Sequence, residues 1–142
     1  MTTPTAAAHR VLLVREWDQQ TTGSGCCGRL EGGDGELAAT DAFSRTRADM
    51  ERMGAVYRAL RAELPNIDVQ IVDPRNIAFL IPGLLGDARR HGLAWSQAWR
   101  ELRRGSGPGA IIVDGRAVSV GTIPDADAAV GLVLQALAAS PR

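Results

Sequence analysis

The sequence predicts one α/β domain built around a four-stranded mixed sheet. Two observations carry this prediction. Helical periodicity fills the space between the second and third of four short apolar segments, and it recurs after the fourth. The chain has 142 residues, the size of one domain, and its 45% hydrophobic residues are enough to bury a core. The expected strands lie near residues 10–16, 67–73, 110–114 and 117–121.

The first two strands are expected to pair in parallel. Val11 to Val14 are four consecutive apolar residues, two of them β-branched, which is typical of a buried central strand. Ile67 to Val72 resemble a second strand. A helix between them is expected to begin at the capping-box pattern of Thr46, or earlier, near Thr40. A strand, a helix and a strand of these lengths indicate a right-handed parallel unit.

The second half of the chain is expected to contain helices and a hairpin. Residues 76–104 have helical character, with a break near Pro82-Gly83 or at His91-Gly92. The pair Asp114-Gly115 is typical of a type I′ turn, so the last two strands should be antiparallel. A final helix should open at Pro124-Asp125.

The segment 18–45 is expected to be a long flexible glycine-rich loop. It contains the only cysteines of the chain, Cys26 and Cys27, which are adjacent. Its part from Thr21 to Gly35 should be the most mobile internal segment. The loop is therefore where we expect the chemistry.

The composition argues against several classes of function. Sixteen arginines balance sixteen acidic residues, and the chain has no lysine, so the electrostatic footprint of a nucleic-acid-binding protein is missing. No apolar run approaches the ~18 residues of a membrane span, and the first residues do not resemble a secretory signal. We therefore expect a cytoplasmic protein without nucleic-acid or membrane partners, in which two thiols are redox-active or metal-binding.

Residues 107–137 resemble the carboxyl-terminal half of a thioredoxin-like domain. That half has a cis-proline, a hairpin that ends at a glycine, and a final helix, which match Pro108 and Gly121. The resemblance covers residues 10–138 and implies a thioredoxin-like fold for the whole domain, 1–142, with helices on both faces of the sheet. The chain has Cys26-Cys27 where thioredoxins have C-x-x-C. It is also similar to arsenical-resistance metallochaperones, which have a Cys-Cys pair and a further cysteine.

The adjacent thiols permit several kinds of chemistry. The resemblance implies that Cys26 and Cys27 lie near Pro108 and the start of the first helix. A helix start, or the neighbouring Arg29, would favour the reactive thiolate. A disulfide between neighbours is strained, because their Cα atoms lie ~3.8 Å apart and ordinary disulfides need ~4.4 Å or more. Mixed disulfides, binding of a soft metal by both thiols, and inert thiols are the alternatives.

Other candidate residues have simpler interpretations. His91 should cap a helix, and joining His9 and His91 to the cysteines as a zinc site matches no zinc spacing. Trp95 and Trp99 are expected to be core or helix-packing residues, whereas Trp17 could line the thiol site or cap the core. The pattern from Gly23 to Gly28 fits a dinucleotide fingerprint only weakly, because it does not lead from a strand into a helix.

The sequence therefore predicts a thiol–disulfide redox protein. Cys26 or Cys27 would be the nucleophile, the other thiol would resolve or assist, and Pro108 would shape the substrate groove. The partner would be a protein or small-molecule thiol or disulfide, and no cofactor is expected. The alternatives are a soft-metal or metalloid carrier or sensor that uses Cys26 and Cys27, and a binding module without redox chemistry. The oligomeric state stays open.

Overall fold

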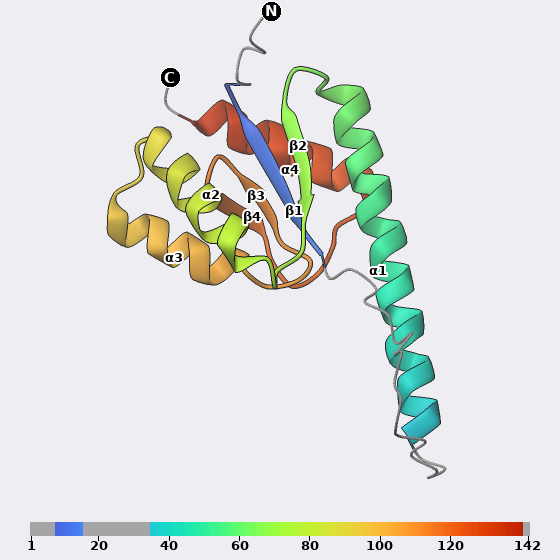
Figure 1. Ribbon diagram of the computed structural model, residues 1–142. Helices are drawn as coiled ribbons and strands as arrows, with labels where there is room; N and C mark the ends of the chain where they lie inside the picture. The colour runs from blue at the N-terminus through green and yellow to red at the C-terminus, as the bar shows by residue number, and fades with distance from the viewer. Residues whose placement is uncertain (1–7, 16–34, 141–142) are drawn as a thin grey trace, which may run out of the picture.

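The computed structural model describes residues 8–15 and 35–140, with side chains for 8–15 and 44–140. The α/β class and the four expected strands are confirmed (Figure 1). The elements, in chain order, are β1 (Arg10–Val14), α1 (Gly35–Glu63), β2 (Asp68–Val72), α2 (Ile77–Arg90), α3 (Trp95–Gly105), β3 (Ile111–Val113), β4 (Arg116–Ser119) and α4 (Ala126–Ala139).

The four strands form one mixed sheet in the order β2-β1-β3-β4. β1 pairs in parallel with β2, with Leu12 opposite Gln70, and antiparallel with β3, with Leu12 opposite Ile112. β3 and β4 form the antiparallel hairpin, with Asp114 and Gly115 both at positive φ, as a type I′ turn requires. The expected pairing of all four strands is therefore confirmed.

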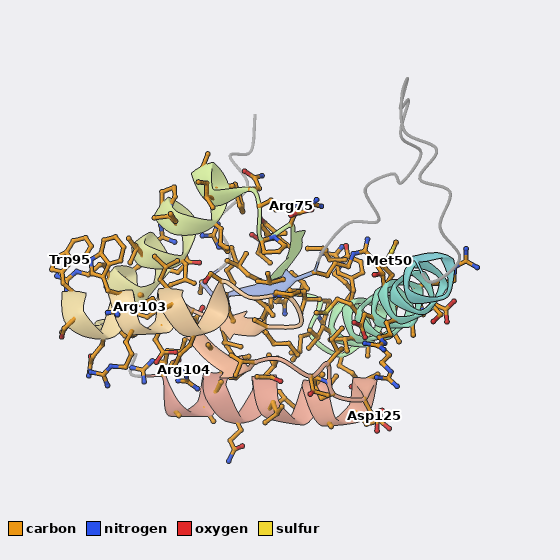
Figure 2. All side chains as sticks on the ribbon, turned by 90° about the horizontal axis from the view of Figure 1, so that it is seen from below. Met50, Arg75, Trp95, Arg103, Arg104 and Asp125 are labelled. Carbon is orange, nitrogen blue, oxygen red and sulfur yellow. The ribbon has the colours of Figure 1, made fainter. Side chains whose placement is uncertain are left out.

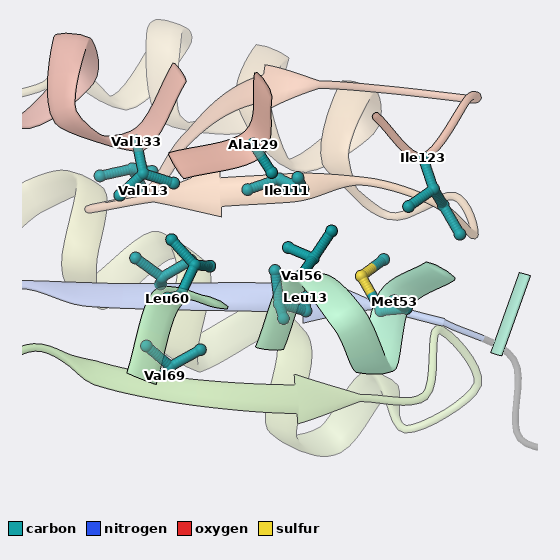
Figure 3. Close-up of a cluster of buried hydrophobic side chains, with 11 residues drawn as sticks. Leu13, Met53, Val56, Leu60, Val69, Ile111, Val113, Ile123, Ala129 and Val133 are labelled. Carbon is teal, nitrogen blue, oxygen red and sulfur yellow. The ribbon is translucent and has the colours of Figure 1, made fainter. Parts of the chain in front are cut away.

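Helices cover both faces of this sheet. On one face, α1 and α4 pack against alternate residues of β1 and β3 (Figure 3). On the other face, α2 and α3 cover the residues in between. Because β1 is buried on both sides, a continuous apolar run suits it better than an alternating one. The larger core comprises Val11, Leu13, Met53, Val56, Leu60, Val69, Ile111, Val113, Ile123, Ala129 and Val133.

The start of α1 differs from the expectation, and the end of α2 decides between the two expected positions of the break. α1 begins at Gly35, so residues 35–45 are helical and the expected start at Thr46 or Thr40 is wrong. Alanine, the best helix former, recurs between Gly35 and Thr46. The chain is therefore already helical where it reaches Thr46. The break in the second half lies at His91-Gly92, where Gly92 adopts φ +84°, and Pro82 lies inside α2. Among the described residues, no helix combines the length and apolarity needed to cross a membrane.

The two tryptophans of α3 do not enter the core. Trp95 and Trp99 are exposed large hydrophobic residues, and Trp95 lies at the outer edge of α3, far from the sheet (Figure 2). Of the expected core or helix-packing roles, the core role is wrong, because α3 buries the face of Ala98 and Leu102 instead. The guanidinium of Arg89 lies 5.0 Å from the Trp95 ring centroid, a cation–π contact on the surface.

Candidate functional site

The strongest candidate site from the sequence is only partly described. Cys26 and Cys27 lie outside the described residues, and so do Trp17, Arg29, the weak dinucleotide pattern and nearly all of the segment expected to be mobile. Pro108 is described, in the turn that precedes β3. The site is therefore built from the residues around Pro108.

Pro108 lines a cavity of about 130 Å³ at the carboxyl end of β1, which we call the Pro108 cavity. β3 runs antiparallel to β1, so the residues before β3 lie beside the residue after β1, which is Arg15. α1 contributes one helical face at i, i+3 and i+4 spacing. The lining residues are Arg15, Thr46, Asp49, Met50, Pro108, Gly109, Gly121 and Ile123.

The turn at Pro108 contains no cis peptide bond. None occurs among residues 8–15 and 35–140, so the Gly107–Pro108 bond is trans and the expected cis-proline is wrong. Gly109, at φ +83°, reverses the chain instead, and its N–H donates to the Val14 carbonyl at 2.7 Å. A proline followed by a glycine at positive φ is the residue pattern of a type II turn, which needs no cis bond.

Two glycines leave bare backbone in the cavity wall. A Cβ on Gly109 would lie 2.7 Å from the Gly121 carbonyl oxygen, so only glycine fits at this close approach. Gly121 is also at positive φ, +80°, and the space beside it is open. Gly109 itself is buried against Gly121 and Ile123, so the exposed main chain in this wall is that of Gly121.

The start of α1 does not lie at this cavity. Thr46, in the cavity wall, is about 17 Å along the helix axis from Gly35 at ~1.5 Å per residue. The electrostatic effect of a helix terminus fades within about one turn. Pro108 and the start of the first helix are therefore separate places, and the position of Cys26 and Cys27 relative to either stays a prediction.

Arginines supply positive charge beside the Pro108 cavity. The Arg15 side chain lies in the cavity wall, and its guanidinium donates to the Met50 carbonyl at 3.5 Å. Arg15 and Met50 also line a wider depression over α1, together with Arg47, Glu51, Gly54 and Arg58. The same cavity wall also contains the Asp49 carboxylate, so the guanidinium of Arg15 favours a thiolate only on its own side of the cavity.

The opposite end of β1 brings both histidines together. His9 and His91 lie beside Asp114, whose carboxylate is fully buried, and we call these three residues the histidine–aspartate group. His91 follows α2 as its C-cap, as expected. The sequence indicated Asp114 only as a residue of the hairpin turn. Its approach to His9 depends on strand register across 105 residues, which no local pattern reveals.

Comparisons with models of protein families, with curated proteins and with solved structures give no match for this chain. The candidate sites are therefore judged by their geometry alone. The Pro108 cavity and the histidine–aspartate group lie at opposite ends of the same strand, β1.

Proposed function

We propose that this protein is a thioredoxin-like thiol–disulfide redox protein in which Cys26 and Cys27 act at the Pro108 cavity. The observation that carries the proposal is the meeting of Arg15, Pro108 and Gly109 around a cavity at the carboxyl end of β1. In the sequence, the segment with both cysteines begins directly after Arg15. The parallel β1–β2 pair and the β3–β4 hairpin followed by α4 support the resemblance.

The proposed reaction is a two-step thiol–disulfide exchange. One cysteine thiolate attacks a substrate disulfide, which forms a mixed disulfide and releases the first substrate thiolate. The second cysteine then attacks the sulfur of the first cysteine in the mixed disulfide. This attack closes the Cys26–Cys27 bond and releases the second substrate thiolate. Two electrons pass from the protein to the substrate. Two molecules of a small thiol from solution reduce the protein again by the same two exchanges and leave as their disulfide, and the strain of a bond between neighbours favours this return.

The residues around the cavity have distinct roles in this proposal. Arg15 stabilises the attacking thiolate and the thiolate that leaves. Gly121 leaves main chain exposed, against which an extended substrate segment can approach closely, and the buried Gly109 packs behind it. Met50 and Ile123 give the same wall an apolar part.

The test is turnover of a small aromatic disulfide with a small thiol as reductant. The chain has two cysteines, so the double variant C26S/C27S is a thiol-free control. We expect the unaltered protein to exceed the uncatalysed rate, and the variant that lacks the attacking thiol to fall to the rate of the control. Iodoacetamide at neutral pH should label the attacking cysteine first, since an ordinary thiol with a pKa of ~8.5 is mostly protonated there. A rate equal to that of C26S/C27S would refute the proposal.

A binding module without redox chemistry is the second candidate. It is favoured by the trans Gly107–Pro108 bond, since the resemblance implies a cis-proline beside redox-active thiols. In that case both thiols should resist iodoacetamide at neutral pH and give no turnover. Stoichiometric uptake of a soft metal by the unaltered protein, absent from C26S/C27S, would instead indicate a carrier.

A further inference from the structure

Three elements meet at the amino end of β1. His9 precedes β1, His91 follows α2, and Asp114 begins the turn between β3 and β4. The antiparallel pairing of Val11 with Val113 brings the turn beside the start of β1. One ligand atom from each residue of the histidine–aspartate group lies within 4.8 Å of the other two.

The spacing of these atoms suits a divalent metal ion. His9 Nδ1 lies 2.7 Å from Asp114 Oδ2, and His91 Nε2 lies 3.6 Å from Asp114 Oδ1. Ligands at ~2.0–2.2 Å around a tetrahedral ion are roughly 3.3 Å apart. The His91–Asp114 distance is close to this value, whereas His9 Nδ1 and Asp114 Oδ2 are at hydrogen-bond distance and must move apart to admit an ion. The imidazole rings stack with centroids 5.7 Å apart and an angle of 26° between their planes. Only a small adjustment separates this arrangement from a coordination site.

The surrounding hydrogen bonds orient the group. The His91 Nδ1–H donates to the Asp87 carbonyl at 2.9 Å, which leaves Nε2 as the nitrogen that faces Asp114. The Arg10 backbone N–H donates to Asp114 Oδ1 at 2.9 Å. A metal-binding histidine usually donates its other N–H to a carbonyl or carboxylate, and a metal-binding carboxylate is itself hydrogen-bonded. Both features are present here.

A second observation points to a cation. Nδ1 of His91 faces the Asp87 carbonyl, and Nε2 faces the Ala8 carbonyl at 3.1 Å as well as Asp114. Both nitrogens therefore face oxygen acceptors, although a neutral imidazole has one N–H. Nε2 therefore needs a proton or a metal ion to satisfy the oxygens around it.

The buried carboxylate also lacks an arginine partner among the described residues. The guanidinium of Arg10, the nearest arginine in sequence to His9, donates to Asp87 at 2.7 Å and to the Gly83 carbonyl at 3.1 Å. The ion-pair partners of Asp114 within 8–15 and 35–140 are the two histidines. A buried charge needs a compensating charge, which a metal ion supplies.

We propose that His9, His91 and Asp114 bind a divalent transition-metal ion of the zinc type, at a site separate from the cysteines. Two imidazoles and one carboxylate match the ligand preference of such ions. Three protein ligands leave a coordination position for water or a substrate, as in catalytic rather than structural zinc sites. The ion can enter past His9, whose side chain is 39% exposed.

The test uses Co²⁺ and Zn²⁺ with the full-length C26S/C27S variant, in which no thiol can bind metal. We expect one ion per chain, with visible Co²⁺ bands and no sulfur-to-metal charge-transfer band. Because the chain has two histidines, the variants H9A and H91A together remove each imidazole in turn. Each should weaken binding by more than the ~10–100-fold typical of an outer-shell change. D127N, at an exposed acid of α4, is the matched control and should bind as the parent does.

A stability measurement guards against variants that fold poorly. The Tm of the C26S/C27S parent and of D127N should rise with Zn²⁺ concentration, whereas the Tm of H9A should not. His9 is partly exposed, so H9A should stay folded even if D114N does not. Absence of Co²⁺ binding by the parent, or unchanged affinity in H9A, would overturn the metal site and leave an all-protein ion-pair network. The redox proposal is unaffected by either outcome, because the C26S/C27S variant used in this test contains no thiols.

Discussion

The two ends of β1 differ in how they use polar groups. At the amino end, the buried carboxylate of Asp87 pairs with Arg10, whereas that of Asp114 contacts two imidazoles and accepts from the Arg10 backbone N–H. At the carboxyl end, the Pro108 cavity is bounded by Arg15, Thr46, Asp49, two glycines and apolar side chains. The first end is closely packed. The second end keeps open space and exposed main chain, which suits a substrate that comes and goes.

The largest expected effect tests how tightly the amino end is packed. Gly115 has φ +81°, and a Cβ there would lie 2.4 Å from the Ala88 backbone nitrogen. We expect G115A to lose about 4 kcal/mol or more of unfolding free energy, because α2 and the hairpin must separate. Gly92 has φ +84° but open space around it, so G92A should cost about 1–2 kcal/mol. Urea unfolding of both variants measures the difference, and equal losses would contradict the packing argument.

The next effect tests the charge pairing at the same end. Asp87 pairs with Arg10 at 2.7 Å and with Arg90 at 3.4 Å, and the two arginine side chains are 23% and 70% exposed. R10A leaves a buried carboxylate without its closer partner and should cost about 3 kcal/mol. R90A removes an exposed partner and should cost less than about 1 kcal/mol. Thermal unfolding of the pair would refute this view if R90A proved the more damaging.

A smaller effect is expected at the carboxyl end. G109A introduces a Cβ 2.7 Å from the Gly121 carbonyl oxygen at φ +83°, and we expect a loss of about 2 kcal/mol. G121A has φ +80° and open space, so it should cost about 1 kcal/mol. Under the proposed function, G109A should also slow disulfide turnover more than G121A does. Similar turnover in the two variants would show that the close approach of Gly109 to the Gly121 carbonyl does not shape the substrate site.

The smallest change in stability is expected for R15Q. Removing this cation from the cavity wall should slow neutral-pH alkylation of the attacking cysteine about fivefold, since a unit charge ~4 Å away contributes about 1 kcal/mol in water. R75Q is the matched control, because Arg75 pairs with Asp73 in the turn after β2. Equal alkylation rates in R15Q and R75Q would remove Arg15 from the proposed mechanism.

The fold was predictable where the signal was local. The apolar run from Val11 to Val14 indicates β1 because both faces of that strand are buried. The Asp114-Gly115 pair indicates the hairpin because few residues accept two successive positive φ angles. The start of α1 was not predictable from Thr46, because a capping-box pattern also occurs inside helices, where the backbone donors are already bonded.

The candidate sites were predictable only in part. Pro108 was identified from its place before the hairpin. The trans isomer of its peptide bond was not predicted, because Gly109 at positive φ reverses the chain there instead. The histidine–aspartate group depends on strand register and on where α2 ends, so its members are far apart in the sequence. The prediction for Cys26 and Cys27 stays a prediction, since both lie outside the described residues.

The place of β1 in the sheet has a consequence for synthesis on the ribosome. β1 is made first, yet one of its two neighbours, β3, belongs to the last part of the chain, and Arg10 and Asp114 are separated by 104 residues. The parallel β1–β2 unit therefore emerges with one unpaired edge of its most apolar strand. Such an edge can pair with another nascent chain, so delayed translation before β3 should increase aggregation and dependence on chaperones.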